Sequence, residues 1–215
     1  MIYTDVTLVL TSCNRIEYLE RTLETLKHLL PLIPNKILVD DSGNYECHQE
    51  LQSLNILKDW TLILNEENIG QPASIDLAYK LVSTPYIFHL EEDWEFEDIS
   101  FIDKALKILN NYKAVSQVTF RKDDPHPNEP TIYDSHYSHS FQFKEEGWRG
   151  QWFGFTHNPS LLRFSEYRKV KPYAGNQEHE IAYKYYELGF KTVTLRDKVV
   201  SHIGLTRYLN STHKV

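Results

Sequence analysis

The stretch Tyr86-Ile-Phe-His-Leu-Glu-Glu-Asp93 is an apolar run that ends in three consecutive acids. A short apolar run that follows a proline is typical of a buried β-strand, so the acids should lie where the strand ends. Carboxylate oxygens are the ligands that Mg²⁺ and Mn²⁺ prefer, and these ions often complete their coordination with phosphate and water. We therefore predict a Mn²⁺ or Mg²⁺ site with Asp93 as the main ligand. Glu91 should be the second ligand, because side chains at i and i+2 of an extended chain share a face. The alternative is a solvated acidic turn.

Strands and helices are predicted to alternate around this stretch. Apolar and β-branched runs predict strands at 6–10, 36–39, 61–64, 85–90 and 114–120. Apolar residues at helical spacing predict helices from Asn14, as N-cap with Glu17 completing a capping box, to Leu30, and at 73–82 and 99–112. This alternation is typical of an α/β fold with a mostly parallel sheet.

The second half of the chain has a different pattern. Residues 121–150 are rich in Pro, His and Asp, and they predict a long loop or a small hairpin that acts as a functional flap. Strands are expected at 151–156, 191–195 and 198–203. Helices are expected at 159–167 and 178–188, the second of them ended by Gly189.

Polar residues gather after the predicted strands, at 11–15, 40–42, 65–68 and 91–93. In open α/β sheets, ligands bind at the C-terminal ends of the strands. Asp40 and Asp41 could accept hydrogen bonds from a nucleotide base or a ribose, or could organise a turn. Asn68-Ile-Gly70 predicts a tight turn into a helix, in which Gly70 permits close approach of the backbone.

Other chemically able residues lie near the C-terminus. Glu178 and Glu180 open a predicted helix, where the helix dipole favours acids and where an acid could also serve as general base. His202 follows an apolar run, and it is either packed or a metal or phosphate contact. The three histidines at 126, 136 and 139 have no cysteine pair beside them, which favours a solvated loop over a zinc site.

Composition excludes several classes of protein. The net charge of −7 argues against a nucleic-acid partner held by phosphate contacts, and a bound cation would be needed to bridge the chain to a nucleotide. Two cysteines, Cys13 and Cys47, argue against a disulfide scaffold and fit a reducing compartment. No apolar run is long enough to span a bilayer, and no signal peptide is recognised, so we expect a cytoplasmic protein without a transmembrane segment.

Taken in this order, these pieces resemble the GT-A fold glycosyltransferases, and most of all the large inverting family 2 group. The resemblance runs from Val6 to His202. It carries Val39-Asp-Asp-Ser-Gly43 onto a base-binding segment, Asn68-x-Gly70-x-x-Ala73 onto the turn before the diphosphate, and Glu91-Glu-Asp93 onto the metal-binding Asp-x-Asp. The opening segment and the small size also resemble the glycosyltransferase domain of a large viral protein.

The resemblance implies a Rossmann-like α/β fold, with a mostly parallel central sheet flanked by helices and a small acceptor-side subdomain. A single domain over 1–215 would have a nucleotide-sugar-binding half at 1–120 and an acceptor-binding, catalytic half at 121–215. The implied donor-binding residues are Thr11, Asn14, Arg15, Asp40, Asp41, Asn68, Gly70, Asp76, Glu91 and Glu92. The implied metal ligands are Asp93, Glu91 and His202, and Trp152 and Phe153 would stack on acceptor sugars.

Two departures from the family pattern bear on the site. The Asp-x-Asp is Glu91-Glu-Asp93 here, and the family's Glu-Asp pair becomes Gln177-Glu178, so Glu178 is the implied base with Glu180 and Glu92 in reserve. The Gln-x-x-Arg-Trp motif of processive synthases is missing.

The expected function is metal-dependent, non-processive transfer of one sugar from a nucleoside diphosphate, UDP or dTDP, to a glycan or other hydroxyl acceptor with inversion. A hexose or a deoxyhexose, such as glucose or rhamnose, is the expected sugar. The alternatives are a nucleotidyltransferase that acts on sugar phosphates and a nucleotide-sugar-binding module without catalysis.

Overall fold

The computed structural model of the chain describes residues 1–120, 131–134, 138–141, 153–195 and 199–204. Within these ranges, nine strands form one sheet in the order β3-β2-β1-β4-β9-β6-β10-β8-β7. Their bounds are β1 Val6–Ser12, β2 Asn35–Asp40, β3 Thr61–Leu64, β4 Tyr86–Glu91, β6 Val115–Thr119, β7 Thr131–Asp134, β8 Ser138–Phe141, β9 Ser160–Arg163 and β10 Lys191–Leu195. Only β9 and β8 run against the others among these strands, which confirms the mostly parallel α/β sheet.

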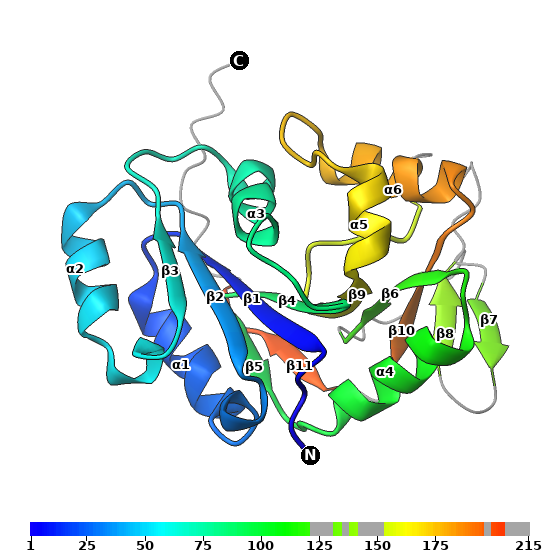
Figure 1. Cartoon of the computed structure of the whole chain (residues 1–215), viewed down its shortest axis with the longest axis horizontal. Coiled ribbons are helices and arrows are strands. Elements are labelled where there is room, and N and C mark those ends of the chain that lie inside the picture. Colours follow the sequence, from blue (N-terminus) through cyan, green and yellow to red (C-terminus); the bar gives the residue numbers. More distant parts are fainter. Residues whose placement is uncertain (121–130, 135–137, 142–152, 196–198, 205–215) are drawn as a thin grey trace.

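Helices cover both faces of this sheet (Figure 1). α1 (Ile16–Leu26) and α4 (Phe101–Asn111) lie on one face, and α3 (Gln71–Tyr79), α5 (Phe164–Val170) and α6 (Glu178–Glu187) lie on the other. Each face has its own apolar core, so β1 is buried along its whole length. Along β1, Leu8 and Leu10 belong to the core under α1 and α4, whereas Val9 belongs to the core under α3. Burial on both faces explains why the parallel strands are continuous apolar runs.

α1 begins differently from the prediction. Its N-cap is Arg15, with no side-chain cap, and Asn14 has a left-handed backbone with φ 56°. The predicted capping box of Asn14 and Glu17 is therefore wrong. The Asn14 N–H points instead to the Asp40 carboxylate, at 3.3 Å, because the β1–α1 connection packs against the end of β2.

Two predicted elements between residues 151 and 167 are also wrong. Residues 160–163 form strand β9 instead of the start of a helix, and β9 inserts antiparallel between β4 and β6. Leu161 and Leu162 are buried in the cores on opposite faces, and periodicity alone cannot separate such a run from a helix. Residues 153–156 do not form a strand, because the Thr156 backbone pairs with the Gln117 side chain.

The structure adds elements that the sequence did not predict. α2 (Tyr45–Ser53) follows β2, with Cys47 and Leu51 in the core shared with α1. β5 (Trp94–Phe96) directly follows the acidic stretch and pairs antiparallel with β11 (Val200–His202) in a separate two-stranded sheet. The register places His202 opposite Trp94, which brings the C-terminal part of the chain next to Asp93.

The remaining predictions are partly outside the described residues. β7 and β8 form a small antiparallel hairpin within 121–150, while the rest of the proposed flap, Trp152 and the start of the strand expected at 198–203 lie outside them. Cys13 and Cys47 are both free thiols. None of the helices in the described ranges has the length and apolar character needed to cross a membrane.

Candidate functional site

The C-terminal ends of β1, β2 and β4 meet at one edge of the sheet. Ser12 pairs in register with Asp40 on one side, and Thr11 pairs with Glu91 on the other. The chain continues from β1 to β2 and β3 in one direction and returns to β4 in the other, so β1 and β4 flank a topological switch point, where α/β proteins bind ligands. The hydroxyls of Thr11 and Ser12 are buried here and have no hydrogen-bond partner among the described residues.

Asp93 is the centre of a charged cluster at this edge. The side chain is buried, and its Oδ2 accepts a hydrogen bond from Arg15 Nη1 at 2.8 Å. His202 Nε2 lies 3.1 Å from the same oxygen. Arg15 Nη1 also lies 3.5 Å from Glu92 Oε1. The structure therefore brings together Asp93, His202, Arg15 and Glu92, from three distant parts of the sequence.

Glu91 has different hydrogen-bond partners from Asp93. The strand ends at Glu91 and residues 92–93 form a turn, so the i, i+2 alternation that predicted a shared face does not continue. Glu91 Oε1 accepts from Gln71 Nε2 at 2.6 Å, and Oε2 accepts from Trp94 Nε1 at 3.1 Å. Burial and the neighbouring Asp93 charge raise the pKa of Glu91 to about 7.

Glu92 lies under the start of α1. The side chain is buried, and its backbone carbonyl accepts from the Thr22 hydroxyl. Burial and the Asp93 charge raise the pKa of Glu92 to about 8, against the lowering effect of Arg15. A group that is mostly protonated near neutral pH is a poor general base, which weakens the reserve role for Glu92.

The donor atoms at this edge fit a divalent cation in part. Asp93 offers a carboxylate oxygen and His202 an imidazole nitrogen, a combination that suits Mn²⁺. No group of three or more His, Cys, Asp or Glu side chains arranged to hold a metal occurs among the described residues. A cation at Asp93 would thus depend on phosphate and water for its other ligands.

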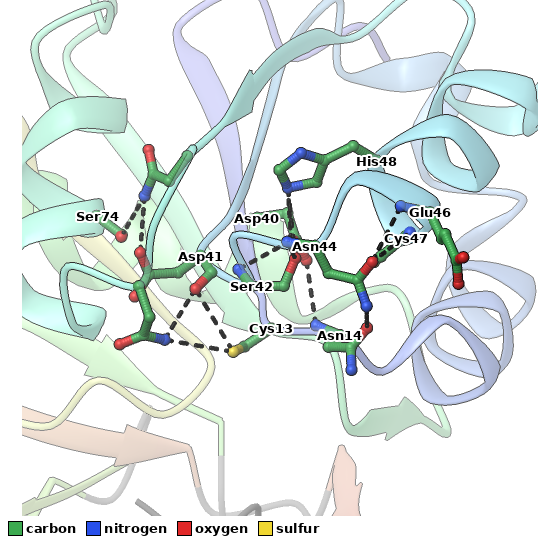
Figure 2. A network of polar contacts seen from close by, with 12 residues as sticks. Cys13, Asn14, Asp40, Asp41, Ser42, Asn44, Glu46, Cys47, His48 and Ser74 are labelled. Atoms are coloured by element: carbon green, nitrogen blue, oxygen red, sulfur yellow. Dashed lines mark hydrogen bonds and ion pairs between the residues drawn. The ribbon is translucent and has the colours of Figure 1, made fainter. Parts of the chain in front are cut away.

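Asp40 organises the loops at the end of β2 (Figure 2). Its carboxylate has no exposed surface. It accepts hydrogen bonds from the Asn14 N–H at 3.3 Å and from both the N–H and the hydroxyl of Ser42, and it lies 3.2 Å from His48 Nε2. A base or a ribose would have to replace one of these donors to contact the carboxylate directly.

Asp41 holds the predicted turn before α3. Its Oδ1 accepts from the Ile69 N–H at 2.9 Å and from Asn65 Nδ2 at 2.8 Å, and its Oδ2 accepts from the Gly70 N–H at 2.8 Å. Asn68 Nδ2 donates to the Asp41 carbonyl at 2.8 Å. Asp41, Asn68 and Gly70 therefore form one unit that is held by its own hydrogen bonds and contains the tight turn predicted at 68–70.

Asp76, on α3, is buried and engaged with the protein itself. It accepts from the Tyr167 hydroxyl at 2.7 Å and from the N–H groups of Tyr173 and Ala174, both at 2.9 Å. These bonds connect α3 to α5 through Tyr167, and to the segment between α5 and α6 through Tyr173 and Ala174.

Glu178 is the first residue of α6, as predicted. Its Oε1 accepts from the His157 N–H at 2.7 Å. After burial and the Asp93 charge, the charge of Glu178 also raises the pKa of Glu91, so the two carboxylates lie within electrostatic range of each other.

The family of the chain follows from comparison with known proteins. The family model "Glycosyl transferase family 2" matches residues 7–170, a span that includes β1, the Asp40-Asp41 segment and the acidic stretch. The chain belongs to glycosyl transferase family 2. A comparison with curated proteins found no match.

Solved structures agree with this family in fold. Residues 1–349 of Staphylococcus aureus TarS match with 14% identity and a TM-score of 0.63, over 92% of this chain and 59% of that one. The mannosyltransferase PcManGT from Pyrobaculum calidifontis, in complex with GDP-Man and Mn²⁺, matches with 16% identity and a TM-score of 0.67, over 94% and 58%. GalNAc-T7 with UDP, GalNAc and Mn²⁺ matches with 11% identity and a TM-score of 0.65, over 91% and 43%. The chain has the GT-A fold and spans about three fifths or less of the length of these proteins.

Glu180 and Phe153 lie apart from the acidic edge of this glycosyltransferase domain. Glu180 is exposed, and its Oε2 accepts from the Gln177 N–H at 2.7 Å in a capping box that stabilises α6. Phe153 stacks on Tyr186, with ring centroids 4.5 Å apart, and contacts Tyr183 at 5.1 Å. Trp152, the other predicted acceptor residue, is outside the described residues.

Two positioning residues in the glycosyltransferase were missed by sequence reasoning. Gln71 fixes Glu91, as described above. Gln117 is buried in β6, donates to the Thr156 carbonyl at 2.7 Å and accepts from the Thr156 N–H at 3.2 Å, which fixes the residue before His157. A polar side chain in the apolar run 114–120 could have pointed to Gln117, because a buried amide needs partners.

Two histidines are buried behind the site. His89 and His157 are 1% and 6% exposed, and their ring centroids are 6.3 Å apart among tyrosine and phenylalanine rings. Neither ring nitrogen of His89, nor Nε2 of His157, has a hydrogen-bond partner among the described residues. Burial lowers the pKa of His89 from 6.5 to about 3 and that of His157 to about 4.

These depressed pKa values predict acid sensitivity. Below pH 6.5, each of these histidines takes up a proton in the unfolded chain. In the folded chain, the His89 side chain stays neutral down to about pH 3. The free energy of unfolding should therefore fall as pH falls, by about 2 kcal/mol per histidine at pH 5. The stability of His89→Leu relative to wild type should improve by that amount between pH 7 and pH 5, as measured by urea unfolding.

The exposed His28→Gln variant is the control, and its stability relative to wild type should not change with pH. The raised pKa values of Glu91 and Glu92 make the free energy of unfolding fall as pH rises, which opposes the effect of the histidines. This contribution is the same in wild type and variant, so it cancels when their stabilities are compared at one pH. A pH-independent difference between His89→Leu and wild type would show that His89 is not held neutral.

Proposed function

We propose that this glycosyltransferase domain transfers a single sugar from a nucleoside diphosphate sugar to a hydroxyl of a glycan or other acceptor, with a divalent cation at Asp93. The observation that supports this most is the convergence of His202 and Arg15 on Asp93 Oδ2 at the switch point of the sheet. It puts carboxylate, imidazole and guanidinium groups where a diphosphate and its cation could bind together.

UDP or dTDP is the proposed nucleotide, and a hexose or deoxyhexose such as glucose or rhamnose is the proposed sugar. Structures of similar fold include TarS 1–349 in complex with UDP-GlcNAc and the PcManGT complex with GDP-Man and Mn²⁺, which supports the class of donor and the metal. The absence of the Gln-x-x-Arg-Trp motif supports transfer of one sugar at a time.

Different residues would have different roles in binding the donor. Asp93 and His202 would hold a Mn²⁺ or Mg²⁺ ion, which when bound neutralises the charge on the leaving diphosphate. The buried hydroxyls of Thr11 and Ser12 have no partner among the described residues, and they would donate to the nucleotide once it binds. Asp41 keeps the turn at 68–70 close to the site, and Asp40 keeps the β1–α1 connection in place.

Glu178 is the proposed base. The His157 N–H orients its carboxylate, and its charge acts on Glu91 at the acidic edge. It would accept the proton of an acceptor hydroxyl while the oxygen attacks the anomeric carbon opposite the diphosphate, and the product would then have inverted configuration.

Metal-dependent donor binding is the first test. A panel of UDP-, dTDP- and GDP-sugars should bind in Mn²⁺, and at least about ten-fold more weakly in EDTA, a difference of about 1.4 kcal/mol measured by calorimetry. Asp93→Asn should reproduce the EDTA result in Mn²⁺. Asp103→Asn, which removes an acid on α4 that binds the Tyr3 hydroxyl, is the control and should bind as wild type. Equal affinity with and without the metal would refute the role of Asp93.

The base is tested by release of nucleoside diphosphate in the presence of sugar acceptors. Glu178→Gln should bind the donor normally and lower transfer by roughly 10²–10⁴-fold. Glu180→Gln is the matched control, because it lies on the same helix turn and glutamine can also complete the capping box. If Glu180→Gln or Glu92→Gln abolishes transfer and Glu178→Gln does not, the base is misassigned; if none does, a binding module without catalysis is favoured.

A further inference from the structure

Arg15 occupies the place where Asp93 would meet a cation. Its Nη1 is 2.8 Å from Asp93 Oδ2, and His202 Nε2 already lies 3.1 Å from that oxygen. The guanidinium thus serves as the positive partner of a buried carboxylate. A divalent ion on the same oxygen would lie close to the guanidinium, and the two positive charges would repel each other.

The rest of the Arg15 guanidinium is poorly satisfied. Nε and Nη2 are buried and have no hydrogen-bond partner among the described residues. Burying N–H donors without acceptors costs free energy. The ring of Tyr18 lies 4.6 Å from the guanidinium carbon and supports it without accepting those bonds. The side chain therefore has donors to spare for an anion such as a diphosphate, to which guanidinium groups bind well.

Gly204 closes the remaining space over this pair. A Cβ on Gly204 would lie 1.9 Å from Asp93 Oδ2 and 2.5 Å from Arg15 Nη2, so the backbone lies directly against both groups. The Ile203 N–H donates to the Asp93 carbonyl at 2.9 Å and fixes this part of the chain. A cation cannot simply be added to Asp93 Oδ2, and something must move.

We propose that Arg15 is an internal counter-ion that is exchanged for the divalent cation when the donor binds. Asp93 and His202 would then hold the ion, and the Arg15 guanidinium, released from Asp93, would donate its N–H groups to the diphosphate. This inference rests on the proposed metal site at Asp93. The exchange makes metal and nucleotide binding cooperative, because the nucleotide supplies the anion that the displaced Arg15 needs.

The test measures Mn²⁺ alone, by electron paramagnetic resonance of the free ion, and then Mn²⁺ with UDP. Arg15→Met, which keeps an unbranched side chain and removes the charge, should bind Mn²⁺ without nucleotide on the order of ten-fold more tightly than wild type. Saturating UDP should strengthen Mn²⁺ binding less in Arg15→Met than in wild type. Arg15→Gln is a second variant, and thermal unfolding checks that each is folded.

Arg21→Met is the matched control. Arg21 lies on the same helix, its guanidinium carbon is 5.9 Å from the same Tyr18 ring, and it pairs with the partly exposed Glu95 instead of Asp93. It should bind Mn²⁺ as wild type does. Unchanged or weaker Mn²⁺ affinity in the folded Arg15 variants, with binding lost in Asp93→Asn, would overturn the exchange and leave the metal site standing. Mn²⁺ binding that Asp93→Asn does not weaken would refute the metal site and the exchange together.

Discussion

A carboxylate removed from water needs a positive partner, and the structure at the end of β4 is built around this need at Asp93. Arg15 comes from the connection after β1, and His202 from the last described strand, to meet one oxygen of this side chain. The pairing of β5 with β11 puts His202 opposite Trp94 and so next to Asp93. Sheet topology, the start of α1 and the C-terminal return are therefore coupled through a single buried charge.

The loops around this charge are held by other carboxylates. Asp40, Asp41 and Asp76 each accept backbone N–H groups from a segment distant in sequence. These bonds satisfy backbone N–H groups that would otherwise be buried without a hydrogen-bond partner. They also leave the loops little conformational freedom before a ligand binds. Because the loops are already ordered, less conformational entropy is lost when a nucleotide binds. The acids that sequence reasoning assigned to ligand contact are thus engaged with the protein itself.

Local patterns in the sequence predicted the parallel strands and the polar edge, because strand ends and helix starts depend on nearby residues. The argument that put Glu91 and Asp93 on one face assumed an extended chain past Glu91, whereas the strand ends at Glu91, so their joint role as metal ligands stays a prediction. β9 was mistaken for a helix because its two leucines are buried on opposite faces, which only the neighbouring strands determine. The contact of Arg15 with Asp93 spans 78 residues, and no spacing rule could reveal it. His202, which the residue pattern left undecided between a packed side chain and a metal or phosphate contact, lies beside Asp93, and its role as a metal ligand stays a prediction.

The most direct test of the account is a crystal structure with Mn²⁺ and a nucleoside diphosphate, in which the anomalous scattering of manganese locates the ion. The account predicts a manganese peak in bonding contact with the Asp93 carboxylate and His202, bridged to the diphosphate, with the Arg15 guanidinium moved from Asp93 to the phosphates. A nucleotide bound at the sheet edge with manganese elsewhere, or with Arg15 still on Asp93, would contradict it.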